Sequence, residues 1–288
     1  MSTIEQTPDK SKIQNPKSKI QKVCLTIAGL DPSGGAGIVA DIKTFTAFGC
    51  FATSVIASIT FQNTTGVFGA INQTAESVRR QFEPIVEDFE VSALKTGMLP
   101  TGEIIEEVAR LVKENNLKIF VVDPVVRSTS GFDLIDDEAL QILIEKLFPL
   151  SALVTPNLPE AERITKMKIK NESDIETAAR IMQNLGAKNV LIKGGHLFNP
   201  KSKVQSSKSA KDFLFVGEEV HIFEAEFIET TATHGTGCTL AAAITANLAL
   251  GESLLEAVGA AKKFVTEAIK NAPNLGKGHS PIGIVVNS

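Results

Sequence analysis

Short apolar runs alternate along the chain with longer segments in which apolar residues recur at helical spacing. The runs cover residues 23–28, 53–60, 118–123, 151–156 and 189–195, and a further run starts at 91. Helical spacing covers 38–48, 75–88, 102–115, 136–148, 173–185 and 254–269. Strands separated by helices predict a mostly parallel sheet with helices on both faces, and the alternation over 212–228 predicts a hairpin.

The stretch 229–251 stands apart because a polar segment with a glycine turn leads directly into a long apolar helix. Gly235 and Gly237 let the backbone turn sharply, and Thr236 begins the expected helix. Free N–H groups and the helix dipole at such a start favour an anion, above all phosphate. Cys238 lies in the first turn, where we expect its thiol to ionise more easily than a free one and to serve as a base or nucleophile. An ordinary loop-to-helix junction with a small buried cysteine explains these residues equally well.

Ligands bind at the carboxyl ends of the strands in such sheets, and the distinctive polar residues follow the predicted strands. Asp123 and Glu160 could hold Mg²⁺ directly or through water, and Lys193 could reach phosphate oxygens. The alternatives are an Asp-Pro turn for Asp123 and a solvated strand end for Lys193.

A second group suits the recognition of a small ring. Gln62 offers donor and acceptor groups side by side, which matches a nitrogen heterocycle, and Met98 could form an apolar wall. Loop capping is the alternative for Gln62, and a place in the core is the alternative for Met98. The GGAG segment does not satisfy G-x-G-x-x-G, and the chain has no G-x-x-x-x-G-K-[ST], which argues against a Rossmann dehydrogenase and a P-loop enzyme.

Composition narrows the class of protein further. With 288 residues, 43% of them hydrophobic, one domain over 23–288 can form its core without a disulfide or metal. A net charge of −4 argues against nucleic-acid and anionic-membrane partners, and no apolar run is long enough for a membrane span. Three widely spaced cysteines fit a reducing cytoplasm. We expect a disordered tail over 1–22, and over 198–211 either a mobile lid or a surface insertion.

Seven motifs together carry a family resemblance that none of them carries alone. They are IAGLDPSGGAGIVADIKTF, ITFQNTTGV, LKTGML, VVDPVV, VTPNLPEA, LIKGGH and THGTGCTLAAAI, in this order. From about 23 to 269 the chain resembles hydroxymethylpyrimidine/phosphomethylpyrimidine kinases of the ribokinase superfamily. The resemblance implies a three-layer α/β/α fold and a usually homodimeric enzyme of thiamine biosynthesis. It also implies that ATP and Mg²⁺ are used to phosphorylate the pyrimidine alcohol and then its monophosphate.

The resemblance also implies roles for individual residues. Gln62 would bind the pyrimidine edge, surrounded by Gly29, Asp41 and Met98. The anion hole would be formed by Gly235, Thr236 and Gly237, with Cys238 at the base position. Lys193 would contact phosphate, and Asn157 and Glu160 would serve Mg²⁺-ATP.

This chain departs from the family pattern in the Ser- and Lys-rich insertion after GGH and in the segment RSTSGFDLI. Two further hypotheses remain open. One is a pyridoxal or pyridoxine kinase, whose ring is similar in size. The other is a catalytically silent ligand-binding regulator.

Overall fold

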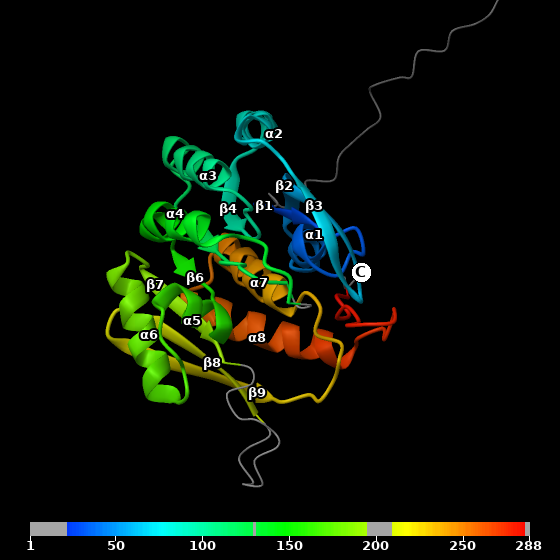
Figure 1. The fold of residues 1–288 in the computed structure, drawn as a ribbon, viewed down its shortest axis with the longest axis vertical. Helices are drawn as coiled ribbons and strands as arrows, with labels where there is room; N and C mark the ends of the chain where they lie inside the picture. The colour runs from blue at the N-terminus through cyan, green and yellow to red at the C-terminus, as the bar shows by residue number, and fades with distance from the viewer. Residues whose placement is uncertain (1–21, 129–130, 195–208, 286–288) are drawn as a thin grey trace, which may run out of the picture.

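A nine-stranded sheet forms the middle layer of the molecule (Figure 1). The computed structural model describes residues 22–128, 131–194 and 209–285. The strand order is β3-β2-β1-β4-β5-β6-β7-β8-β9. The strands are β1 Val23–Leu30, β2 Phe51–Asn63, β3 Gly66–Asn72, β4 Val91–Thr96, β5 Phe120–Val122, β6 Leu153–Val154, β7 Asn189–Lys193, β8 Ser209–Val216 and β9 Glu219–Glu226.

The centre of the sheet is parallel and both of its edges are antiparallel. Strands β2, β1, β4, β5, β6 and β7 pair in parallel. Strand β3 is antiparallel to β2, and the hairpin β8–β9 is antiparallel to β7. The predicted mostly parallel sheet and the predicted hairpin are therefore confirmed.

Helices pack on both faces of the sheet and complete the predicted three-layer α/β/α fold. One layer contains α1 Gly37–Ala47, α7 Thr236–Leu250 and α8 Leu254–Lys270. The other contains α2 Ala75–Asp88, α3 Gly102–Glu114, α4 Asp137–Leu147, α5 Leu158–Thr165 and α6 Glu172–Asn184, and the 3-10 turn η2 Phe148–Leu150 follows α4. Helix α7 contacts α1, α8 and three central strands, which explains why it is apolar on nearly every side.

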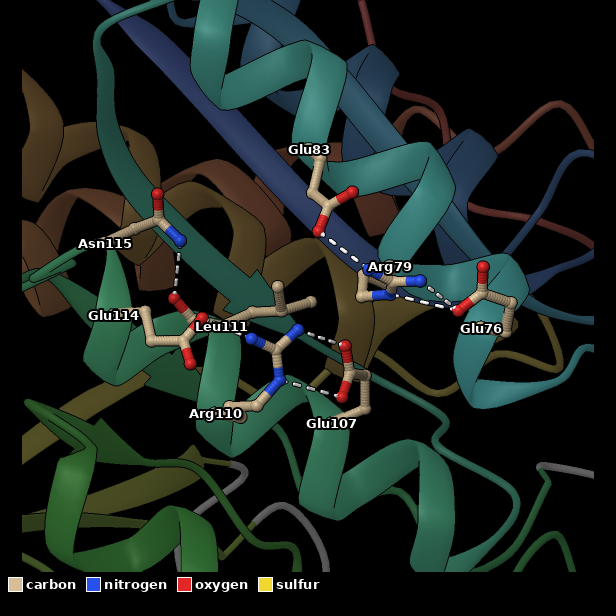
Figure 2. Close-up of polar contacts among 8 residues, drawn as sticks. All are labelled: Glu76, Arg79, Glu83, Glu107, Arg110, Leu111, Glu114 and Asn115. Carbon is tan, nitrogen blue, oxygen red and sulfur yellow. Dashed lines mark hydrogen bonds and ion pairs between the residues drawn. The ribbon is translucent and has the colours of Figure 1, made fainter.

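Helices α2 and α3 carry pairs of oppositely charged side chains on their outer surfaces (Figure 2). Arg79 lies between Glu76 and Glu83 on α2, and Arg110 lies between Glu107 and Glu114 on α3. Pairs three and four residues apart stabilise a helix by only about 0.3–0.5 kcal/mol each. The apolar faces of these helices, buried against the sheet, therefore contribute more of their stability.

Three local expectations from the sequence were wrong or fall outside the described residues. The predicted strand 53–60 is longer, since β2 runs from Phe51 to Asn63, and strand β3 was not predicted. Helix α5, which begins at Leu158, was not predicted either. The predicted tail 1–22, except Lys22, and most of the predicted insertion 198–211 lie outside the described residues, while 209–211 belong to β8.

Candidate active site

The N-terminus of α7 points at the carboxyl ends of the central strands. Gly235 is its N-cap and has a φ of +85°, a conformation that favours glycine. The N–H of Thr236 is engaged by the carbonyl of Thr233 at 3.3 Å. The N–H groups of Gly237 and Cys238 have no hydrogen-bond partner in the described part of the chain. The N–H of Gly237, which belongs to the predicted anion hole, and that of Cys238, which does not, are thus available to an anion, with the positive end of the helix dipole behind them.

Lys193 lies directly beside these amides. Its Nζ is 3.2 Å from the position that a Cβ on Gly237 would occupy, so a side chain there would crowd the ammonium. Nζ donates to Asp123 Oδ1 at 2.8 Å and lies 3.9 Å from Glu160 Oε2. Burial lowers the pKa of Lys193, but the two carboxylates outweigh burial and raise it, which keeps the ammonium charged.

The carboxylates around Lys193 differ in their protonation. Burial raises the pKa of Asp123, but the ammonium groups of Lys193 and Lys95 outweigh it and lower the pKa, so Asp123 is ionised. For Glu160, burial and the nearby Asp123 outweigh Lys193 and raise the pKa to about 7. Asn157 and Glu160 also form the capping box of α5, with reciprocal hydrogen bonds of 2.8 and 2.7 Å.

The oxygen donors present fit a magnesium ion that is held mainly by water and phosphate. Asp123 Oδ2 has no hydrogen-bond partner among the residues the structure describes. The same residues contain no group of three or more acidic, His or Cys side chains that could form a complete protein cage. Mg²⁺ is commonly bound by one or two carboxylates together with waters and substrate phosphates, so Asp123 and Glu160 suit it.

Cys238 lies between the two halves of the site, but the expected effect on its thiol is wrong. Burial raises the pKa of Cys238 to about 11, while Lys95 and the backbone N–H of Gly37 lower it by less. Burial therefore outweighs the helix start, and the thiol is neutral at pH 7.

Two of the four predicted ring-binding residues, Gly29 and Met98, are in contact with each other. The Met98 sulfur is 2.9 Å from the position of a Cβ on Gly29, so these two residues pack together. Gln62 stands near the end of β2, where its side chain helps to lower the pKa of the buried Asp31. Asp41 instead lies beneath the site, where its carboxylate is completely buried.

Lys95 is a buried residue that sequence reasoning missed. Its side chain is 0% exposed and its Nζ donates to both oxygens of Asp41, at 3.0 and 2.9 Å, while Thr26 donates to Asp41 Oδ2 at 2.7 Å. Burial lowers the pKa of Lys95, but Asp41 and the nearby Cys238 and Asp123 raise it above its ordinary value. A lone lysine inside the apolar run VSALKTGML was the available signal.

Asp31 and His234 were also missed. His234 precedes the N-cap of α7, and its Nε2 lies 2.7 Å from Asp31 Oδ2 in the loop after β1. The signal for Asp31 was the turn sequence DPSG, in which an Asp side chain accepts from the backbone two residues later. Nothing in the sequence pairs it with a histidine 203 residues away.

Comparisons with known proteins identify the family of the chain. The family model described as phosphomethylpyrimidine kinase matches residues 31–283. The chain belongs to this family. The resemblance is thereby confirmed, and the protein is a kinase.

Relatives and a solved structure place the chain within the family. A hydroxymethylpyrimidine/phosphomethylpyrimidine kinase of Bacillus subtilis is 44% identical over 257 residues, which cover 89% of this chain and 92% of the relative. A thiamine biosynthesis bifunctional protein of Geobacter sulfurreducens is 44% identical over 91% of this chain, but the chain spans only about half (52%) of its length. The crystal structure of a Bacillus subtilis pyridoxal kinase in complex with ADP superposes with a TM-score of 0.82 at 38% identity, covering 92% of this chain and 98% of that one.

Within the described ranges, no helix is both long enough and apolar enough to cross a bilayer.

Proposed function

We propose that this kinase phosphorylates 4-amino-5-hydroxymethyl-2-methylpyrimidine with ATP, and then phosphorylates the monophosphate to the diphosphate, in thiamine biosynthesis. The observation that carries the proposal is the meeting of Lys193, Asp123 and the free amides of Gly237 and Cys238 at one point beside the Gly29–Met98 contact. The first group suits a phosphoryl group in transfer, and the second suits a small flat ring. Family membership supports the pyrimidine as that ring.

On the phosphate side, positioning and stabilisation of charge supply most of the rate, because phosphoryl transfer needs little covalent chemistry from the protein. The amides of Gly237 and Cys238 would donate to the oxygens of the migrating group, and Lys193 would neutralise their negative charge. Asp123 keeps the Lys193 ammonium in place. Bound Mg²⁺, held by Asp123 and Glu160, would neutralise further phosphate charge.

On the acceptor side, the two reactions make different demands. In each, an acceptor oxygen forms a bond to the terminal phosphorus of ATP while the bond to ADP breaks. The alcohol must also lose its proton, whereas a phosphomonoester already presents an anionic oxygen, because its second pKa is about 6. We propose that Cys238 assists the first reaction and contributes little to the second.

Turnover of each acceptor by the purified protein tests the proposal. ADP release is measured with the pyrimidine alcohol, its monophosphate, pyridoxal and pyridoxine, with and without Mg²⁺. Turnover of both pyrimidines that requires Mg²⁺ is the expected result. Absence of turnover with every acceptor would instead favour the ligand-binding regulator.

A second candidate, pyridoxal kinase, is favoured by one observation. The pyridoxal kinase of Bacillus subtilis superposes over 98% of its length. Turnover of pyridoxal or pyridoxine alone in the same assay would select this function.

We further propose that the protein acts in the cytoplasm as a homodimer. The three buried or half-buried cysteines, all free, support a reducing compartment. Exposed apolar side chains on the edge strand β3 support self-association.

A further inference from the structure

Asp31 is a hydrogen-bonding hub in the loop that follows β1. Its carboxyl is only 2% exposed. Oδ1 accepts from Ser33 N at 2.8 Å and Ser33 Oγ at 2.7 Å. Oδ2 accepts from Gly35 N at 3.2 Å and Ala36 N at 2.9 Å, and it meets His234 Nε2 at 2.7 Å. Burial raises the pKa of Asp31, but His234, Ser33 and Gln62 together lower it below its ordinary value, so the group is a carboxylate that only accepts.

The hub joins two loops that come from opposite ends of the chain. The loop 31–36 leads into α1 and belongs to the acceptor side, together with Gln62. His234 belongs to the loop that presents the amides of α7. Where the loops touch there is no spare room, because a Cβ on Gly235 would lie 1.8 Å from the carbonyl oxygen of Gly35. The side-chain contact and the backbone contact therefore fix the same distance between the loops.

We propose that Asp31 and His234 are positioning residues, whose hydrogen bond holds the acceptor-side loop in register with the anion-binding start of α7. The inference rests on the proposed phosphoryl transfer, but it applies to either acceptor ring. Each substrate is held mainly by its own half of the site. Loss of the Asp31–His234 hydrogen bond therefore leaves substrate binding nearly intact but misplaces the two reactants relative to each other. A displacement of about 1 Å can slow a reaction about a hundredfold.

His234→Leu removes the hydrogen bond, and His234→Gln restores it, because the amide nitrogen of Gln reaches the place of imidazole Nε2. We expect kcat to fall at least about thirtyfold in the Leu variant, with KM for ATP and for the acceptor changed by less than about threefold, and the Gln variant to recover most of kcat. His221→Leu is the matched control, since His221 pairs with Glu219 at 3.1 Å on the edge strand β9 and should change neither constant.

His234→Asn covers the case in which the Leu variant does not fold, because the shorter amide cannot reach Asp31. Higher kcat in the Gln variant than in the Asn variant, at equal melting temperature, supports the positioning role. Equal kcat in these two variants, or a loss in the Leu variant that appears in KM alone, overturns it. Wild-type turnover of the pyrimidines tests the proposed function separately, since the inference concerns only the ratio of variant to wild type.

Discussion

Lys193 is the residue on which the charge balance of the phosphate side depends. It is 13% exposed and lies between a carboxylate with a lowered pKa and one whose pKa is about 7. Removing its charge would leave Asp123 buried without the nearer of the two ammonium groups that lower its pKa, the other being Lys95. The same ammonium thus has a structural and a chemical role.

Lys193→Met is expected to lower kcat at least about a hundredfold, because it removes both a charge that stabilises the migrating phosphoryl group and the partner of Asp123. Steady-state kinetics with the pyrimidine alcohol measure the effect. Lys211→Met is a suitable control, since Lys211 makes a comparable pair with Glu172 at 3.1 Å on the surface. Similar activity in the two variants would show that Lys193 has no part in transfer.

Cys238 gives a prediction that depends on pH. With a pKa of about 11, about one thiol in ten thousand is ionised at pH 7, and this fraction rises tenfold for each pH unit below the pKa. If the thiolate takes the proton of the alcohol, the rate of the first phosphorylation should rise from pH 7 to 9, and Cys238→Ala should abolish that rise. The monophosphate, which has no alcohol proton to lose, should show no such rise. Parallel pH profiles with the two substrates check this, and identical profiles would exclude the division of labour.

At the scale of single residues, the sequence predicts those site residues that can be recognised from their own type and their immediate neighbours in the chain. Lys193, Asp123 and Cys238 stand out because polar groups follow apolar strands or enter a glycine turn. Asp31, His234 and Lys95 owe their importance to partners 203 and 54 residues away. The pKa of Cys238 could not be predicted either, because burial, which dominates it, is a property of the folded chain.

At the scale of elements, the C-terminal strap, residues 274–283, ties the β2–β3 hairpin to the start of α7. Thr64, at the tip of the hairpin, accepts from Gly278 N and Lys277 N through Oγ1 and from His279 N through its carbonyl at 2.7 Å. His234 N donates to Ser280 O at 3.2 Å. The sequence does not predict this strap, because a segment held by backbone hydrogen bonds leaves no apolar pattern.

Gly278→Val should release the strap from the hairpin, since a Cβ there would lie 2.1 Å from the carbonyl oxygen of Thr64. We expect KM for the acceptor to rise about tenfold, because Gln62 lies at the same end of β2, while KM for ATP changes little. Gly259→Val on α8 is the control, because this glycine, like Gly278, has no positive φ, and its Cβ position makes only an ordinary contact with Phe223 at 3.5 Å. An unchanged KM for the acceptor would show that the strap does not support the ring site.

Strands and helices in which apolar residues recur at regular spacing were predictable, whereas β3 was not. Residues 66–72 include two glycines and two large apolar side chains that face solvent, so the run lacks the pattern of a half-buried strand. Helix α5 was hidden by a proline at its second position, although its capping box was present in the sequence as Asn157 and Glu160.

At the scale of the whole molecule, exposed apolar side chains of the β2–β3 hairpin form a surface without a partner among the described residues. Phe68 is 69% exposed, and Phe61 and Ile71 also face solvent. Strand β3 is in addition an open sheet edge. These features favour a second copy of the chain as the occupant.

Sedimentation equilibrium of the wild type should give the mass of a dimer, and Phe68→Lys combined with Ile71→Lys should shift it to the monomer, because a charge buried in an apolar interface without a partner is strongly unfavourable. Val220→Lys combined with Ile222→Lys, on the opposite edge strand β9, is the control and should leave the dimer intact. A monomeric wild type would contradict the proposal.

The contact between Gly35 and Gly235 has a consequence for how specificity can diverge. It consists of main chain, so no side chain there can be exchanged to favour one vitamin precursor over another. If Met98 and Gln62 line the ring site as proposed, selectivity should reside in such walls rather than in this contact. We therefore expect substitutions in those walls to redirect such a catalyst from one nutrient to another without altering the transfer centre.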